Sequence, residues 1–122
     1  MNGRRDPKLI LFAVLAVGVL VAGVGALAYR SLTAPPVVQV SIVDYRFQPA
    51  NVTIKAGTTV RWINMDFVGH TVSFGTHGNE TGVESDLMGH MGTFGYTFVG
   101  PGTYPYHCDP HPYMTGVVVV IP

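Results

Sequence analysis

Several residues that could bind a metal lie close together near the C-terminus, in the stretch YPYHCDPHPYM, residues 104–114. It contains the single cysteine, Cys108, with His111 three residues later and Met114 three residues beyond that. Such a thiol can be a core residue, a nucleophile or a metal ligand. A nucleophile needs a base that a third group orients, and no such set is apparent. The carboxylate of the adjacent Asp109 also opposes formation of a thiolate.

The metal-ligand interpretation accounts for more of the residues. A thiolate, two imidazoles and a weakly bound thioether form the donor set of a trigonal copper site with an axial methionine. The second imidazole is expected from another strand, and GHTVSF offers His70, whose alternation with Val72 and Phe74 directs its ring to the interior. Zinc fits less well, because structural zinc sites usually take four strong nitrogen or sulfur ligands and a thioether is a poor ligand for Zn²⁺. The sequence therefore predicts one copper ion held by His70, Cys108, His111 and Met114.

The first part of the chain differs from the rest. No charged side chain occurs from residue 9 to residue 29, which at about 1.5 Å per residue spans roughly 30 Å, the thickness of a bilayer core. Arg4, Arg5 and Lys8 precede this stretch and predict that residues 1–8 stay in the cytoplasm. The prediction is a single-pass anchor over residues 9–29 in the cell membrane, with the remainder on the extracytoplasmic side. Cleavage as a signal peptide, after an A-x-A-like site at residues 26–28, is the alternative.

Charge is also distributed unevenly. Residues 1–36 contain four Lys/Arg and one acid, whereas residues 37–122 contain three Lys/Arg and six acids. The exported part therefore lacks the basic patch that nucleic-acid binding requires. One cysteine cannot form an intramolecular disulfide, so the thiol has another role or is buried.

Residues 37–122 are predicted to form one all-β domain after a short linker, residues 30–36. Short runs rich in Val, Ile, Thr, Phe and Tyr alternate with Gly, Pro, Asn and Asp. Seven such runs are apparent, at residues 37–43, 50–57, 58–64, 70–74, 93–99, 102–108 and 115–121. Seven or eight strands in a domain of this size indicate a two-sheet β-sandwich. Residues 75–92 are expected to be an irregular surface excursion.

Residues 37–122 resemble the cupredoxins, the plastocyanin-like and amicyanin-like blue copper proteins. The resemblance rests on WINMDFVGHTV around His70, on FGYTF, and on GTYPYHCDPHPYMTGVVVV around the other three predicted ligands. It implies an eight-stranded Greek-key sandwich with copper at one end, bound by the same four residues. One position departs from the family pattern, because Thr71 follows the first histidine where asparagine often braces the ligand loop. A threonine hydroxyl can replace only part of that support.

The resemblance also implies what the domain does. Copper alternates between Cu(II) and Cu(I) and carries one electron between a redox protein donor and an acceptor. These partners would dock near His111, in an apolar patch formed by Pro110, Pro112, Tyr113 and Phe67. An enzyme acting on a small-molecule substrate is not expected, because four protein ligands leave no vacant position on the metal.

The remaining histidines and methionines leave one alternative open. His77, Met88, His90 and Met91 lie within residues 77–91, and soft thioethers with imidazoles suit Cu(I). A copper chaperone or storage protein would use this stretch without redox cycling. Methionine is more often a core filler, so the electron carrier is the leading hypothesis. His107 precedes Cys108 in a strand and is expected to point to the opposite face, on the surface or beside the metal ligands.

Overall fold

The computed structural model describes residues 35–122, which form a compact unit of their own. Nine strands are present in these residues. Their bounds are β1 Val37–Val43, β2 Arg46–Gln48, β3 Asn51–Lys55, β4 Thr58–Asn64, β5 Ser73–Thr76, β6 Asn79–Glu84, β7 Thr93–Phe98, β8 Gly102–His107 and β9 Thr115–Ile121.

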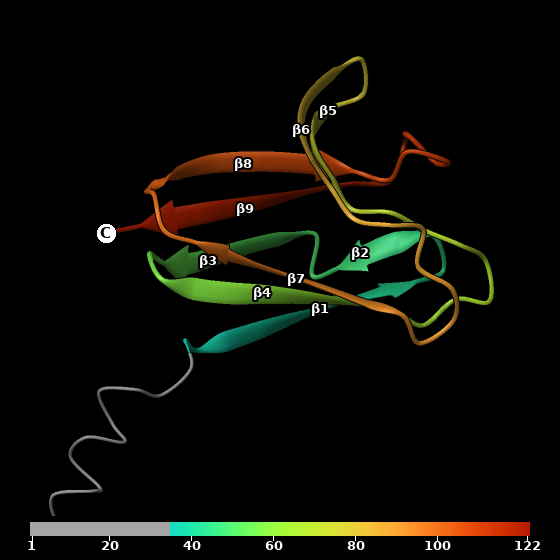
Figure 1. Ribbon diagram of the computed structural model, residues 1–122, viewed down its shortest axis with the longest axis horizontal. Coiled ribbons are helices and arrows are strands. Elements are labelled where there is room, and N and C mark those ends of the chain that lie inside the picture. Colours follow the sequence, from blue (N-terminus) through green and yellow to red (C-terminus); the bar gives the residue numbers. More distant parts are fainter. Residues whose placement is uncertain (1–34) are drawn as a thin grey trace, which may run out of the picture. The chain divides into compact units, whose positions relative to one another are not determined.

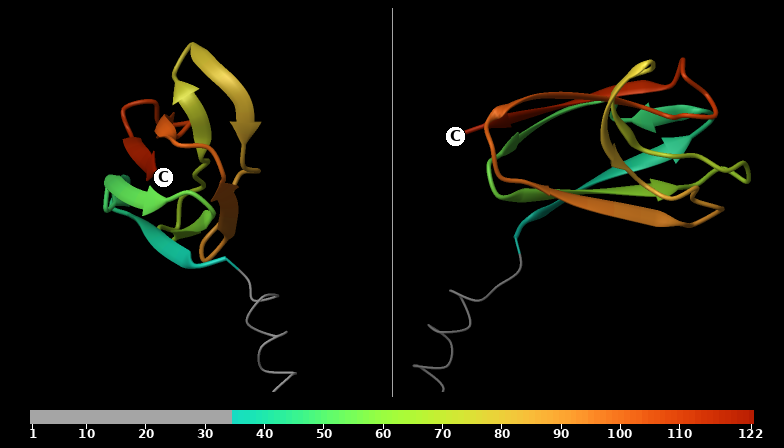
Figure 2. Two further views of the ribbon diagram at one scale, coloured as in Figure 1. Left: turned by 90° about the vertical axis from the view of Figure 1, so that its left-hand side faces the viewer. Right: turned by 45° about the horizontal axis from the view of Figure 1, so that its top comes forward.

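The strands form two facing sheets (Figures 1 and 2). One sheet has the order β2-β1-β4-β7 and the other the order β3-β9-β8-β5-β6. The pairs β1–β4 and β3–β9 are parallel, and the other neighbours are antiparallel. Because many neighbours are not consecutive in sequence, the chain crosses repeatedly between the sheets. The predicted all-β sandwich is confirmed, with nine strands in the described residues, because the short β2 and the exposed β6 add to the seven runs recognised in the sequence.

The core follows from the alternation seen in the sequence. In β1, Val40 and Ile42 are fully buried, and the strand β4 buries Val60 and Trp62. The Trp62 ring meets that of Tyr106, on β8 of the opposite sheet, edge to face at 5.3 Å between centroids. Inward-pointing side chains of both sheets therefore make one apolar interior.

Gly116 on β9 is required by this packing. Tyr106 pairs with Gly116 across β8 and β9, and a Cβ atom built on Gly116 would overlap the Tyr106 ring. Only glycine leaves space for the ring at this position.

The prediction that residues 75–92 form an irregular surface excursion is wrong in part. It contains β6, which pairs with β5 to form a hairpin joined by the two-residue turn at His77 and Gly78. Most side chains of β6 are exposed, so its sequence lacks the alternating apolar pattern by which strands are recognised. Figure 1 shows the hairpin at the edge of its sheet.

The predicted cytoplasmic segment 1–8, the anchor or signal peptide at residues 9–29 and most of the linker lie outside the described residues. Among residues 35–122 there is no helix of the length and apolar character needed to cross a membrane.

Candidate metal centre

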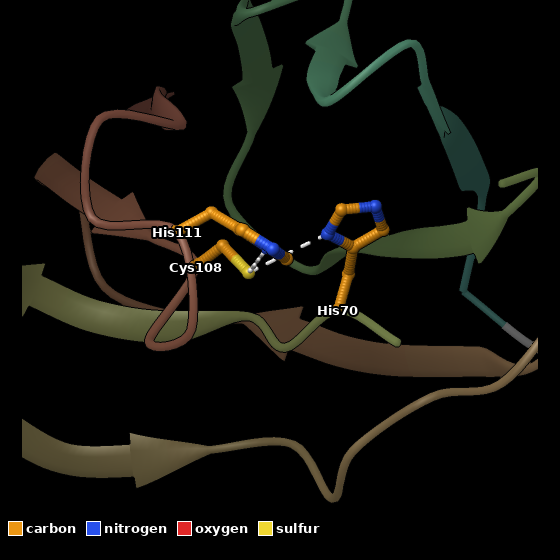
Figure 3. Close-up of side chains that lie close together, drawn as sticks. All are labelled: His70, Cys108 and His111. Atoms are coloured by element: carbon orange, nitrogen blue, oxygen red, sulfur yellow. Dashed lines mark hydrogen bonds between the residues drawn. The ribbon is translucent and has the colours of Figure 1, made fainter. Parts of the chain in front are cut away.

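Three of the four predicted ligands converge at one end of the sandwich (Figure 3). Sγ of Cys108 lies 3.6 Å from Nδ1 of His70 and 3.5 Å from Nδ1 of His111. His70 and Cys108 are completely buried, whereas His111 is partly exposed. Figure 1 shows the β4–β5 and β8–β9 loops, which carry these residues, at the end of the sandwich opposite the C-terminus. One thiol and two imidazole nitrogens thus face a common point that a metal ion could occupy.

The loop from Cys108 to Met114 is closed by its own backbone. The amide of Cys108 donates to the carbonyl of Met114, at 3.1 Å, and the amide of Met114 donates to the carbonyl of His111, at 2.9 Å. Pro110 and Pro112 flank His111 and fix their own φ angles. Met114 is buried, with 2% of its surface exposed. The loop therefore has a defined shape that places His111 beside the thiol and keeps Met114 in the interior.

The orientation of the His70 ring is fixed by Asp66, which the sequence analysis missed. Nε2 of His70 lies 2.8 Å from Oδ2 of Asp66. The carboxylate can only accept, so Nε2 carries the proton and Nδ1 keeps its unshared pair, directed toward Cys108. A carboxylate behind a ligating histidine is a common way to fix the tautomer and to strengthen the ligand.

Asp66 also fixes the turn between β1 and β2. Its Oδ1 accepts the amide of Asp44 at 2.8 Å, and Oδ2 accepts the amide of Tyr45 at 3.0 Å. Both turn residues have positive φ, 51° for Asp44 and 57° for Tyr45, which is unfavourable for residues other than glycine. The carboxylate thus stabilises a strained turn from 22 residues away in sequence.

These contacts set the charge state of Asp66. Partial burial raises its pKa, but the hydrogen bonds from the Tyr45 amide, the His70 ring and the Asp44 amide outweigh burial and lower the pKa below its ordinary value. Asp66 is therefore ionised at neutral pH.

The turn between β1 and β2 places the Tyr45 ring next to both histidines of the candidate centre. Its centroid lies 5.3 Å from that of His70 and 4.9 Å from that of His111, edge to face in both cases. Tyr45 therefore packs against both imidazoles and restricts their movement.

Thr71 connects the two ligand segments. Its amide donates to Sγ of Cys108 at 3.4 Å, and its Oγ1 accepts the amide of Asp109 at 2.9 Å. A hydrogen bond to the sulfur stabilises negative charge on the thiolate. Thr71 therefore supplies part of the support that asparagine often gives in the family, as its single hydroxyl allows.

Asn64, at the end of β4, supports the loop before His70. Its side-chain amide donates to the carbonyls of Val68 and Met88, and its Oδ1 accepts the amide of Asp66. Asn64 is fully buried, so each of these bonds satisfies a group that water does not reach. No spacing in the sequence singles out Asn64, and only the fold brings its partners together.

Residues 77–91, which the copper storage hypothesis would use, do not bring the thioethers of Met88 and Met91 to a common site. Met88 is buried, with 5% of its surface exposed, and its backbone pairs with that of His70. Met91 is 51% exposed, and the His90 ring stacks on Phe67 at 4.1 Å between centroids. Met88 thus belongs to the core, as the sequence suggested for methionine in general.

His107 is not a surface residue, since only 1% of it is exposed. It does not face the candidate centre either. Its ring lies beside a separate group of polar side chains formed by His77, Glu80 and Asp109.

Comparison with known proteins identifies the family. Residues 36–121 match the family described as copper binding proteins, plastocyanin/azurin family. The chain belongs to this family. Among its relatives, amicyanin-alpha of Methylorubrum extorquens is 37% identical over 115 residues, covering 92% of this chain and 97% of the relative. Amicyanin of Paracoccus versutus is 35% identical over 120 residues, covering 92% and 89%. The crystal structure of amicyanin from Paracoccus versutus superposes with a TM-score of 0.62 at 34% identity, over 70% of this chain and 81% of that one.

The donors present fit the copper that the plastocyanin/azurin family binds. A buried thiol and two imidazoles whose Nδ1 atoms face it are the strong donors of a copper site, and a buried thioether follows in the same loop. The Asp66 and Thr71 contacts hold the imidazole and the sulfur in the required states. In this cupredoxin the fold therefore places both the candidate ligands and the residues that hold them, Asp66 and Thr71.

Proposed function

We propose that this cupredoxin is a membrane-anchored electron carrier, with one copper ion bound by His70, Cys108, His111 and Met114. The observation that carries the proposal is the convergence of Cys108 Sγ with Nδ1 of two histidines in a largely buried pocket. Copper bound there supplies a one-electron couple between Cu(II) and Cu(I).

The protein's own part in electron transfer is to keep the ligands still. Small movement between the two oxidation states keeps the reorganisation small, and rigid positioning is what the fold supplies. Asp66 holds the His70 ring, Thr71 holds the Cys108 sulfur, and Tyr45 packs against both imidazoles. The chain is proposed to act as a carrier and not as an enzyme, because four protein ligands would leave no vacant position for a substrate on the metal.

The electron is proposed to enter and leave through His111. Its ring is partly exposed, whereas His70 is buried. Large apolar side chains next to the ligands in sequence are exposed to solvent, among them Phe67 at 88% and Tyr113 at 70%. Exposed apolar side chains near the ligands are proposed to form a surface for transient docking of a partner protein. Redox protein donors and acceptors are therefore the expected partners.

Kinetics with a partner test the docking surface. Replacement of Tyr113 or Phe67 by lysine is expected to slow electron exchange with the native partner and to leave the reduction potential almost unchanged, since neither side chain is a ligand. Leu87→Lys, at a position that is 66% exposed, is a further probe of how far the patch extends. Unchanged exchange rates in both the Tyr113 and the Phe67 variants would exclude docking at this surface.

Anchoring is proposed from the uncharged stretch at residues 9–29 and from the basic residues before it. The native chain is expected to stay with membranes after a salt wash and to need detergent for extraction. Protease added from the outer side should reach the copper domain. A mature protein that begins near residue 29 would show that the stretch is a cleaved signal peptide instead.

The copper chaperone or storage alternative is not favoured. Met88 is needed in the core and Met91 lies on the surface. An electron carrier needs one tight copper site, whereas storage at residues 77–91 would require a second, which Met88→Ala together with Met91→Ala would remove.

A further inference from the structure

We propose that His77, Glu80, His107 and Asp109 form a second metal site, which binds a divalent ion of the zinc type. One donor atom from each of the four residues lies within 4.8 Å of the others. None of them is a predicted copper ligand, so both sites could be filled at once.

The site lies where the β5–β6 hairpin meets the end of β8. His77 lies in the turn of the hairpin, Glu80 follows at the start of β6, His107 is the last residue of β8, and Asp109 begins the copper loop. The hairpin turn has two residues, with Gly78 at a φ of 84°. Such short turns are well defined, so the hairpin brings two donors to a fixed place above His107.

His107 gives the strongest indication of a cation. Its Nδ1 lies 2.8 Å from the carbonyl oxygen of Gly75, which can only accept, so Nδ1 carries the proton. Nε2 lies 3.0 Å from Oδ1 of Asp109 and 3.6 Å from Oε1 of Glu80. Two carboxylate oxygens beside this nitrogen call for positive charge, which either a second ring proton donated to Asp109 or a metal ion bound to Nε2 can supply. We assign a metal ion, because a further imidazole, that of His77, lies in the same group of donors.

The carbonyl that fixes this tautomer is itself held by tight packing. Gly75 has a φ of 98°, and a Cβ atom there would overlap the backbone of Asn79. The facing strand β6 therefore lies close against Gly75 within the hairpin, and this packing fixes the direction of the Gly75 carbonyl toward His107.

Glu80 is held ready as a carboxylate. The amide of Gly78 donates to Oε1 of Glu80 at 2.9 Å, and this bond is the main reason that the pKa of Glu80 lies below its ordinary value. The same oxygen lies 3.7 Å from Nδ1 of His77. The glutamate thus stands between the two imidazoles.

The distances and the donor types suit zinc. Ligands about 2.0 Å from a tetrahedral zinc ion are roughly 3.3 Å from each other. Three of the donor separations, 3.0, 3.6 and 3.7 Å, lie near that value, and all donor atoms are within 4.8 Å of one another. Two imidazoles and two carboxylates are too few oxygen donors for calcium or magnesium and lack the sulfur that Cu(I) prefers. An ion can enter from solvent, because the side chains of His77, Glu80 and Asp109 are 64%, 39% and 41% exposed.

The second site is linked to the first through Asp109. This residue follows Cys108, and its amide donates to Oγ1 of Thr71, whose own amide donates to the Cys108 sulfur. A divalent ion bound to Asp109 would place positive charge close to the thiolate. Positive charge favours the reduced state of copper, so zinc is expected to raise the reduction potential, a consequence that rests on the proposed function.

Calorimetric titration of the full-length, copper-loaded chain with zinc chloride tests the site. One zinc ion per chain is expected to bind while the visible absorption of the copper centre stays unchanged. Glu80→Gln and His77→Asn should each weaken binding by roughly 10- to 100-fold. The matched controls Glu84→Gln, an exposed acid on the same strand, and His90→Asn, an exposed histidine, should bind zinc as the wild type does.

A second measurement identifies the ligand atom. In the diamagnetic Cu(I) protein, the ring resonances of His107 should shift on addition of zinc, and those of His90 should not. The Cys108→Ala chain, which lacks the copper thiolate, should bind zinc with the wild-type affinity, so a failure of the copper assignment would leave this result intact. Absence of zinc binding, equal weakening by Glu84→Gln, or loss of the copper absorption in step with zinc binding would overturn the inference.

Discussion

Asp66 is expected to stabilise both the fold and the copper centre, and Asp66→Asn tests this with almost no change of shape. Asparagine has one acceptor oxygen and no charge. If that oxygen takes the place of Oδ1, it still accepts from the Asp44 amide. The NH₂ group of asparagine then lies at the Oδ2 position, where it faces two other donors, the Tyr45 amide and Nε2 of His70. Both bonds at the Oδ2 position are then lost.

The expected loss can be estimated from these bonds. A hydrogen bond to a charged group contributes about 1.5–3 kcal/mol, so two of them amount to roughly 3 kcal/mol at the lower value. The Asp66 side chain is 13% exposed, and water can replace part of this. A decrease of about 2 kcal/mol in the free energy of unfolding is therefore expected. Copper affinity should fall by roughly 10- to 100-fold, as found when the partner of a ligating histidine is removed.

Urea unfolding of the copper-free chain at several pH values measures the contribution of Asp66 to the free energy of unfolding. Because the pKa of Asp66 is lowered in the folded state, its contribution is fully present above the unfolded value of about 3.9 and is lost as the pH falls through the folded pKa. The difference between wild type and Asp66→Asn should therefore narrow below about pH 4.

Asp44→Asn is the matched control for this experiment. Asp44 binds Asp66 through its backbone amide, its residue is exposed, and asparagine tolerates positive φ well. This variant should be as stable as the wild type. If Asp66→Asn unfolds at the same urea concentration as the wild type and binds copper as tightly, the carboxylate has no such supporting role.

Three further predictions concern the core and the metal. Burial raises the pKa of Tyr106 to about 12, so the unfolded state ionises first and this residue should cost the wild type roughly 2 kcal/mol of stability from about pH 10 to pH 12. Tyr106→Phe should lose less stability than the wild type by that amount, and an equal loss in the two proteins would exclude Tyr106 as the cause. Gly116→Ala should lower the free energy of unfolding by about 1–3 kcal/mol, because the new methyl group overlaps Tyr106. The control Gly89→Ala, at a position where nothing lies within 4 Å, should be near neutral. Equal urea midpoints for the two variants would contradict this packing. Copper should raise the melting temperature, because binding stabilises the folded chain by about 4 kcal/mol when the free copper concentration is 1,000 times the dissociation constant. An unchanged melting temperature in the presence of copper would mean that the folded site does not bind it.

The sequence was sufficient where a pattern is local. Alternation in β1 and β4 predicted which side chains are buried, because one face of each strand lies against the opposite sheet. The spacing of Cys108, His111 and Met114 predicted a ligand loop, because three donors within one turn-rich segment cannot lie far apart. The His70 ring is buried as expected, but not for the predicted reason: residues 70–75 are all buried, without alternation, and β5 begins only at Ser73.

The sequence was insufficient where a contact joins distant segments. Asp66 and the turn at Asp44 and Tyr45 are more than 20 residues apart, and nothing local shows that one carboxylate holds both. The strand β6 was missed because its side chains are mostly exposed and polar. His107 points away from the ligands, as predicted, but it is buried rather than on the surface, because it lies against Gly75 and Glu80 of the β5–β6 hairpin.

The absorption spectrum of the Cu(II)-loaded chain tests the copper assignment most directly. Charge transfer from the thiolate sulfur of Cys108 to Cu(II) should give an intense blue colour with one copper ion per chain, and His90→Asn should retain it. Cys108→Ser removes the sulfur and should abolish the colour. An intense blue spectrum that survives Cys108→Ser, or a wild-type chain that binds Cu(II) without becoming blue, would contradict the assignment.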